Sequence, residues 1–84
     1  MHSTRFGLPV LLTEHARLRM TQRNVTASLV LEIIDTGILK HAGNSNYWLY
    51  KHLPDRTDNL LCVAAAVNNV VVVKTIRHHW ELSL

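Results

Sequence analysis

Two apolar segments near the end of the sequence, Leu60–Val67 and Val70–Arg77, are separated only by Asn68-Asn69. Apolar runs of this length, bounded by turn residues, are typical of β-strands. Because asparagine tolerates positive φ, the Asn-Asn pair predicts a two-residue type I′ turn between them. Both faces of the resulting hairpin are mostly apolar, so we expect it to lie in the centre of a sheet and to be covered on both sides for much of its length.

The predicted turn also sets the register of the hairpin. It places Val67 opposite Val70, and therefore Cys62 opposite Thr75. Polar side chains, including those of Thr75 and Arg77, then gather at the end of the hairpin away from the turn. Cys62 is the only cysteine of the sequence, so it is expected to be a buried small hydrophobic residue rather than half of an internal disulfide.

Local signals predict two short helices before the strands. Thr13 can cap a first helix over Glu14–Arg23, which Asn24 would close. Thr26 can cap a second helix, and Gly37 is placed to end it in a left-handed conformation. The second helix has an apolar stripe at helical spacing, formed by Leu29, Val30, Ile33 and Ile34.

The remaining segments predict two shorter strands, Ile38–Ala42 and Tyr47–Leu53, joined by a turn. Together with the hairpin they give an α+β fold in which two N-terminal helices precede a four-stranded antiparallel sheet. Residues 1–12 contain Gly7 and Pro9, which break any regular pattern, so this segment is expected to be an irregular arm. The 84 residues are expected to form a single domain.

The charge balance is modestly basic and uneven along the chain. Nine lysines and arginines against six acidic residues leave a formal charge of +3, and residues 1–23 contain four arginines but one acid, Glu14. This distribution favours a polyanionic partner, although a solvated basic surface would have the same composition. The apolar part of the N-terminus, Phe6–Leu12, is interrupted by Gly7 and Pro9 and is too short to cross a membrane, so we expect a cytoplasmic protein.

One histidine and two arginines of the first predicted helix recur at four-residue spacing. His15, Arg19 and Arg23, the cationic row, fall on one strip of the helix beside the apolar residues Ala16 and Met20. The row therefore borders the face that is expected to be buried. A titratable group flanked by two permanent cations on such a seam suits a phosphate-binding surface, or an enzyme that acts on phosphate.

The first helix and the order of the elements resemble a known family. The pattern H-A-x-x-R-M-x-x-R-G-[IV] is typical of small bacterial domains of unknown function that are grouped with RelE-like and BrnT-like toxins, in the superfamily of barnase, EndoU, colicin nucleases and RelE. Six positions of the pattern are matched here: His15, Ala16, Arg19, Met20, Arg23 and Val25. Asn24 stands where the family has glycine, and Arg77 stands where an aromatic residue is expected. The resemblance implies a RelE-like fold and the toxin of a toxin–antitoxin pair, with RNA and an antitoxin as partners.

Cleavage of RNA by its own 2′-hydroxyl needs a base, cations for the charge on the phosphoryl oxygens, and an acid for the leaving oxygen. His15 is the candidate base, since an imidazole titrates near neutrality and neighbouring arginines favour its neutral form. Arg19 and Arg77 are candidates for stabilising the transition state, while Arg23 and Lys51 would contact flanking phosphates. Such an endoribonuclease is independent of metal ions and cofactors.

The face of the sheet that the helices cover decides which strand residues join this site. Thr75 and Arg77 share a cleft with the first helix in one case, and Lys74 does so in the other. The adjacent residues His78 and His79 would point to opposite faces of a strand, so no metal site is predicted.

The same residues also have structural interpretations. His15 could cap its helix or bond a strand carbonyl, and Arg19 and Arg23 could form salt bridges with Glu32 or Asp35. The alternative function is a non-catalytic module that binds nucleic acid or protein through the cationic row. A third possibility is a small subunit that docks through the edge of its sheet.

Two further points stay open at the level of the sequence. Trp48 and Tyr50 share one strand face, where such residues pack in a core more often than they stack on bases. A chain of this size buries only about 60% of its unfolded surface, so a partner or a second copy in a homodimer would add to its stability.

Overall fold

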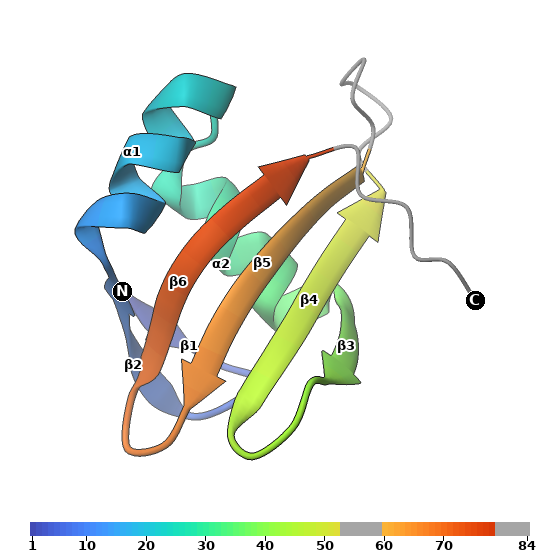
Figure 1. Ribbon diagram of the computed structural model, residues 1–84. Coiled ribbons are helices and arrows are strands. Elements are labelled where there is room, and N and C mark those ends of the chain that lie inside the picture. The colour runs from blue at the N-terminus through green and yellow to red at the C-terminus, as the bar shows by residue number, and fades with distance from the viewer. Residues whose placement is uncertain (53–59, 79–84) are drawn as a thin grey trace.

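Two helices and six strands make up the part of the chain that the computed structural model describes, residues 1–52 and 60–78 (Figure 1). In chain order they are β1 (His2–Ser3), β2 (Leu8–Leu12), α1 (Glu14–Arg23), α2 (Ala27–Thr36), β3 (Ile38–His41), β4 (Asn46–His52), β5 (Leu60–Val67) and β6 (Val71–His78). The strands form one mixed sheet in the order β1-β2-β6-β5-β4-β3. The protein is α+β, but the expected RelE-like arrangement with a four-stranded antiparallel sheet is wrong.

The two additional strands come from residues 1–12, which are not the irregular arm that the sequence predicts. β1 pairs with β2 in antiparallel orientation, and β2 pairs with β6 in parallel orientation, with Val10 opposite Val71. Gly7 and Pro9, from which the sequence predicted an irregular arm, are both compatible with this hairpin. Gly7 adopts a φ of +65° between the two strands, and Pro9, which has no N–H to donate, precedes the residues that pair with β6.

The N-terminal hairpin is held to α2 by Asp35. One carboxylate oxygen accepts a hydrogen bond of 2.6 Å from the buried Ser3 hydroxyl, and the other accepts one of 2.9 Å from the Thr4 hydroxyl. Burial acts to raise the pKa of Asp35, but these bonds and those from the backbone amides of Thr4 and Arg5 outweigh it, so the pKa lies below its ordinary value. Folding therefore favours the charged form of this carboxyl group.

The connection between β5 and β6 is longer than predicted, and the register differs. Val67 pairs with Val71, so three residues form the connection, closed by a hydrogen bond of 3.1 Å from the Asn68 amide to the Val70 carbonyl. Neither asparagine of this turn has positive φ, so the type I′ turn is wrong. A β-bulge follows, because Ala65 pairs with Val73 while Ala64 pairs with Thr75, which leaves Lys74 as the extra residue. As a result Cys62 faces Arg77, not Thr75.

Both helices begin and end where the sequence predicts, but one cap differs. The Thr13 and Thr26 hydroxyls accept hydrogen bonds from the Ala16 and Leu29 amides, and Asn24 closes α1 in the left-handed region with a φ of 56°. Gly37 instead has a φ of −73°, so the predicted left-handed cap is wrong. This glycine is required for space: a Cβ atom here would lie 2.5 Å from the Ile33 carbonyl oxygen.

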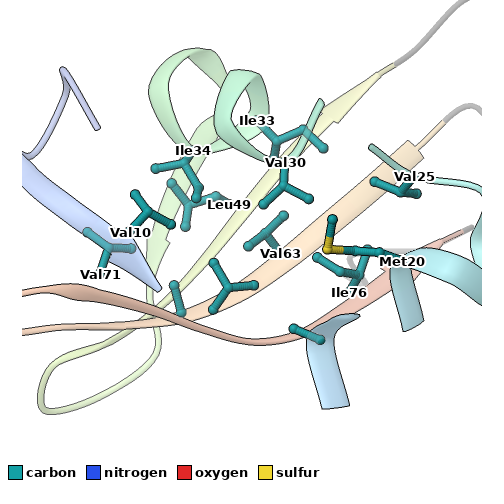
Figure 2. Packing of buried hydrophobic residues seen from close by; sticks show 13 residues of the cluster. Val10, Met20, Val25, Val30, Ile33, Ile34, Leu49, Val63, Val71 and Ile76 are labelled. Atoms are coloured by element: carbon teal, nitrogen blue, oxygen red, sulfur yellow. The ribbon is translucent and has the colours of Figure 1, made fainter. Parts of the chain in front are cut away.

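The two helices pack against one face of the sheet, and the hydrophobic core lies between them and the strands (Figure 2). Alternation along the strands places Leu49, Val63 and Ile76 on this inner face, where all three are fully buried. Buried residues from the helices and the segment that joins them, and from β2, β5 and β6, complete the core: Val10, Ala16, Met20, Val25, Val30, Ile33, Ile34, Ala65, Val71 and Val73. Within the described residues neither helix reaches the opposite, outer face, although the sequence predicted cover on both sides.

Candidate nucleic-acid interface

α1 lies along the edge of β6 that faces away from β5, beyond the point where β2 ends. We call this edge the outer edge of β6. At its start, the Thr13 amide donates to the Val73 carbonyl and the Thr13 hydroxyl donates to the Lys74 carbonyl, both at 3.2 Å. At its end, Arg23 Nε donates to the Ile76 carbonyl, also at 3.2 Å. Figure 1 shows α1 beside β6, with α2 behind the sheet. These bonds give backbone groups at the edge of β6 partners that β2 does not supply.

The cationic row lies on the flank of α1 that borders this edge. Ala16 and Met20 are buried beneath the helix, Arg19 and Arg23 are half-buried, and His15 is exposed. Arg19 Nη1 donates a hydrogen bond of 3.2 Å to Gln22 Oε1. Within residues 1–52 and 60–78 the His15 ring forms no hydrogen bond, so the structure does not show the capping interaction considered for it.

The two acidic residues considered as salt-bridge partners of the row are engaged elsewhere. Glu32 lies 2.9 Å from Lys51 Nζ, and Asp35 accepts the bonds of the N-terminal hairpin. Lys51 also donates a hydrogen bond of 2.7 Å to the Thr36 hydroxyl. Lys51 is two residues after the buried Leu49 in β4, so both lie on the side of the sheet that the helices cover. The structure therefore does not bring Lys51 together with the residues of the outer face.

Arg77 extends over the outer face of the sheet, which carries Trp48, Tyr50, Cys62, Thr75 and Arg77. Its guanidinium carbon lies 5.9 Å from the centroid of the Trp48 ring, a distance at which a cation–π interaction is favourable. Cys62 pairs with Arg77 on one side and with Tyr50 on the other. Burial raises the pKa of the Cys62 thiol to about 11, against the opposing effect of the Arg77 charge, so folding favours the protonated thiol over the reactive thiolate.

A depression of about 320 Å³ lies on the outer face over β5. We refer to it as the β5 depression; five of its lining residues are Asn46, Trp48, Ala64, Lys74 and Thr75. The side chain of Lys74 crosses β5 from β6 to β4, where Nζ lies 2.6 Å from Asn46 Oδ1. The small side chains of β5 leave room for this crossing. Lys74 and Thr75 therefore share one surface with Trp48. The sequence had left open which of the two lies beside the first helix.

Residues of β4 are the part of this surface that the sequence did not identify as a site. Trp48 pairs with Ala64, which pairs with Thr75, so the three side chains form a row across β4, β5 and β6. Strand alternation already placed Trp48 and Tyr50 on one face, and this was the available signal. Their neighbours depend on the register of three strands, which the sequence predicted incorrectly at the bulge.

The opposite flank of α1 borders a second depression, of about 370 Å³. Arg17 and Thr21 line it, together with Asn24 and the residues that lead into α2. It lies on the other side of the helix from the cationic row, because Arg17 and Thr21 project away from His15 and Arg19 at 100° per residue. Arg17 is exposed, and it provides an internal comparison for the arginines of the row.

The described residues contain no group of three or more histidine, cysteine, aspartate or glutamate side chains arranged to hold a metal ion; His79 lies outside them. No helix among the same residues is both long and apolar enough to span a membrane.

Comparison with known proteins gives a family but no further relative. Neither a curated protein nor a solved structure gave a match. A protein-family model matches from the last residue of β2 to the end of β6, and so includes α1, the outer face and the β5 depression. Because this match covers residues 12–78, the chain belongs to the family described as Domain of unknown function (DUF4258).

Proposed function

We propose that this protein binds single-stranded RNA across the outer edge of β6. The observation that carries the proposal is the position of β6 between two kinds of side chain. Its edge carbonyl at Ile76 holds Arg23 and thereby the cationic row, and the next residue, Arg77, lies over Trp48 on the outer face. A nucleic-acid strand that follows this edge meets cations on one side and an aromatic surface on the other.

The chemistry of the surface favours an unpaired strand. Arg19 and Arg77 offer guanidinium groups that match phosphate oxygens, and His15 offers a further exposed donor. Aromatic side chains on a sheet contact bases that are not already stacked in a duplex. The net charge of +3 favours association with any polyanion, whereas the resemblance of α1 to toxin-like nucleases is the reason to name RNA.

The test is a titration of a fluorescently labelled, unstructured RNA by fluorescence anisotropy at several salt concentrations. Arg19→Gln should weaken binding and reduce the slope of log K against log salt by about 0.7, the value for one lost phosphate contact on a single strand. Arg17→Gln is the matched control, since it removes the same group from the opposite flank of the same helix. Equal effects of the two variants, or no dependence on salt, would contradict the proposal, and DNA of the same sequence tests the choice of RNA.

A metal-independent endoribonuclease is the second candidate, and the exposure of His15 favours it. His15 removes the proton of the 2′-hydroxyl, which attacks the phosphorus; the bond to the 5′-oxygen breaks, and that oxygen takes a proton from water. Arg19 and Arg77 stabilise the charge on the phosphate. The activity would make the protein a cytoplasmic toxin with an antitoxin as its partner. RNA incubated with the protein in EDTA should then acquire 2′,3′-cyclic phosphate ends, and His15→Ala should abolish them while RNA binding persists. Intact RNA with the wild-type protein would reject cleavage and leave binding as the function.

A further inference from the structure

We propose that the β5 depression is a binding site for one unpaired nucleotide, with its base against Trp48 and its phosphate at Lys74. The inference rests on the proposed function, because it assigns the base-contacting part of the same RNA-binding surface.

The size of the depression suits a single small ligand. Its volume of about 320 Å³ is at the lower end of the range for small-molecule sites, about 300–1,000 Å³. The space exists because Ala64 stands between Trp48 and Thr75 in the row across three strands. A larger residue at this position of β5 would fill the depression.

Trp48 supplies the aromatic wall for the base, because it lines the depression. Along β4 the residues Asn46, Trp48 and Tyr50 alternate onto the outer face, so Trp48 lies between the other two. Tyr50 is in line with Arg77 across the sheet, whereas Asn46 lines the depression. The indole of Trp48 thus has the Arg77 guanidinium within cation–π distance and also lines the depression, where a base would contact it.

Lys74 and Asn46 supply the polar contacts. The Lys74 ammonium group has three donors, and its bond of 2.6 Å to Asn46 Oδ1 uses one of them. The other two can bind phosphate oxygens. The same bond holds the Asn46 amide so that its N–H donors can bind acceptors on the edge of a base, and the Thr75 hydroxyl can donate or accept. A charged group, an aromatic wall and an amide thus converge within one depression, as the recognition of a nucleotide requires.

The experiment measures Trp48 fluorescence in the full chain carrying Trp80→Phe, which leaves a single tryptophan. Nucleoside 5′-monophosphates should quench it in a saturable manner, and inorganic phosphate should not. Lys74→Gln should weaken binding by about tenfold, the effect of one lost charged hydrogen bond. Arg17→Gln is the matched control and should leave the affinity unchanged. Circular dichroism and the backbone amide resonances of Ala64 and Thr75 establish that the variants fold and that the ligand lies over β5.

Three results would overturn the inference: no saturable quenching by any nucleotide, an equal response to phosphate alone, or equal affinities of Lys74→Gln and Arg17→Gln. Failure here is distinguishable from failure of the proposed function. If RNA binding is sensitive to Arg19→Gln but nucleotides do not bind, the nucleotide site is wrong and RNA binding stands. If nucleotides bind over β5 and RNA oligomers do not bind, the proposed RNA-binding function is wrong and the nucleotide site stands.

Discussion

Replacement of Gly37 by alanine is a stringent test of how α2 is joined to the sheet. A Cβ atom at this position would lie 2.5 Å from the Ile33 carbonyl oxygen and 2.8 Å from the Tyr50 carbonyl oxygen. Ordinary contact begins at 3.4 Å, so the overlaps are 0.9 Å (3.4 − 2.5) and 0.6 Å (3.4 − 2.8). Both neighbours are backbone atoms, one of α2 and one of β4, so they cannot move aside as a flexible side chain would.

Two effects of opposite sign decide the magnitude. Overpacking costs about 1–3 kcal/mol, and two backbone overlaps place Gly37→Ala near the upper end. The φ of −73° is normal for alanine, so the variant also gains about 0.4–1 kcal/mol from the less flexible unfolded chain. The net expectation is a loss of about 2 kcal/mol in the free energy of unfolding, which lowers the Tm of a domain of this size by about 8–16 °C.

Urea denaturation followed by circular dichroism measures this difference. Gly43→Ala is the matched control, because a Cβ atom there meets nothing within 4 Å while the φ of +101° is unfavourable for alanine. The control should cost about 1 kcal/mol through backbone conformation alone. A Gly37→Ala variant as stable as the wild type, or more stable, would refute the steric argument.

Three further predictions concern titration and charge. The pKa of Asp35 is lowered by folding, so its carboxylate stabilises the fold above about pH 4, and this contribution is lost as the pH falls through the folded-state pKa. Asp35→Asn should therefore lower the free energy of unfolding by about 1–3 kcal/mol at pH 7 and by much less at pH 2, as measured by urea denaturation. An equal loss at both pH values would contradict this prediction. Folding raises the pKa of Cys62 from 9.0 to about 11, so at pH 8 the thiolate is about a hundredfold rarer in the folded protein than in the unfolded chain. Alkylation by iodoacetamide should then be at least a hundredfold slower in buffer than in urea. Equal rates in the two solutions would refute this prediction. Lys51→Gln removes a partly exposed ion pair with Glu32 and should cost no more than about 1 kcal/mol, with unchanged RNA affinity; a loss of affinity would restore the phosphate contact predicted from the sequence.

The elements that the sequence predicts correctly are those whose determinants are local. Thr13 and the Ala16 amide are three residues apart, and Asn24 needs only its own left-handed conformation to close α1. The N-terminal hairpin is different, because its place in the sheet depends on pairing between Val10 and Val71. A parallel pairing at such a distance along the chain leaves no periodic signal near Gly7 and Pro9, which by themselves favour irregular structure.

The candidate site divides along the same line. The seam position of His15, Arg19 and Arg23 follows from helical spacing, and the structure has the row on a flank of α1 with the two arginines half-buried. The approach of Arg77 to Trp48 follows from strand registers, where a slip of one residue moves every side chain to the other face. The sequence predicted a two-residue turn without a bulge, and both errors lie between the turn and Arg77.

The bulge at Lys74 connects the two halves of the proposed interface. If β6 continued from the buried Val73 through Lys74 without a bulge, strict alternation would place Arg77 on the inner face, beneath the helices and away from Trp48. With it, Arg77 lies on the outer face, and the Lys74 side chain crosses β5 to Asn46. The Lys74 carbonyl also accepts a hydrogen bond from the Thr13 hydroxyl at the start of α1. The bulge thus anchors the helix that carries the cationic row and directs two cations to the face that carries Trp48, which is why we propose that the row and the β5 depression form one RNA-binding surface.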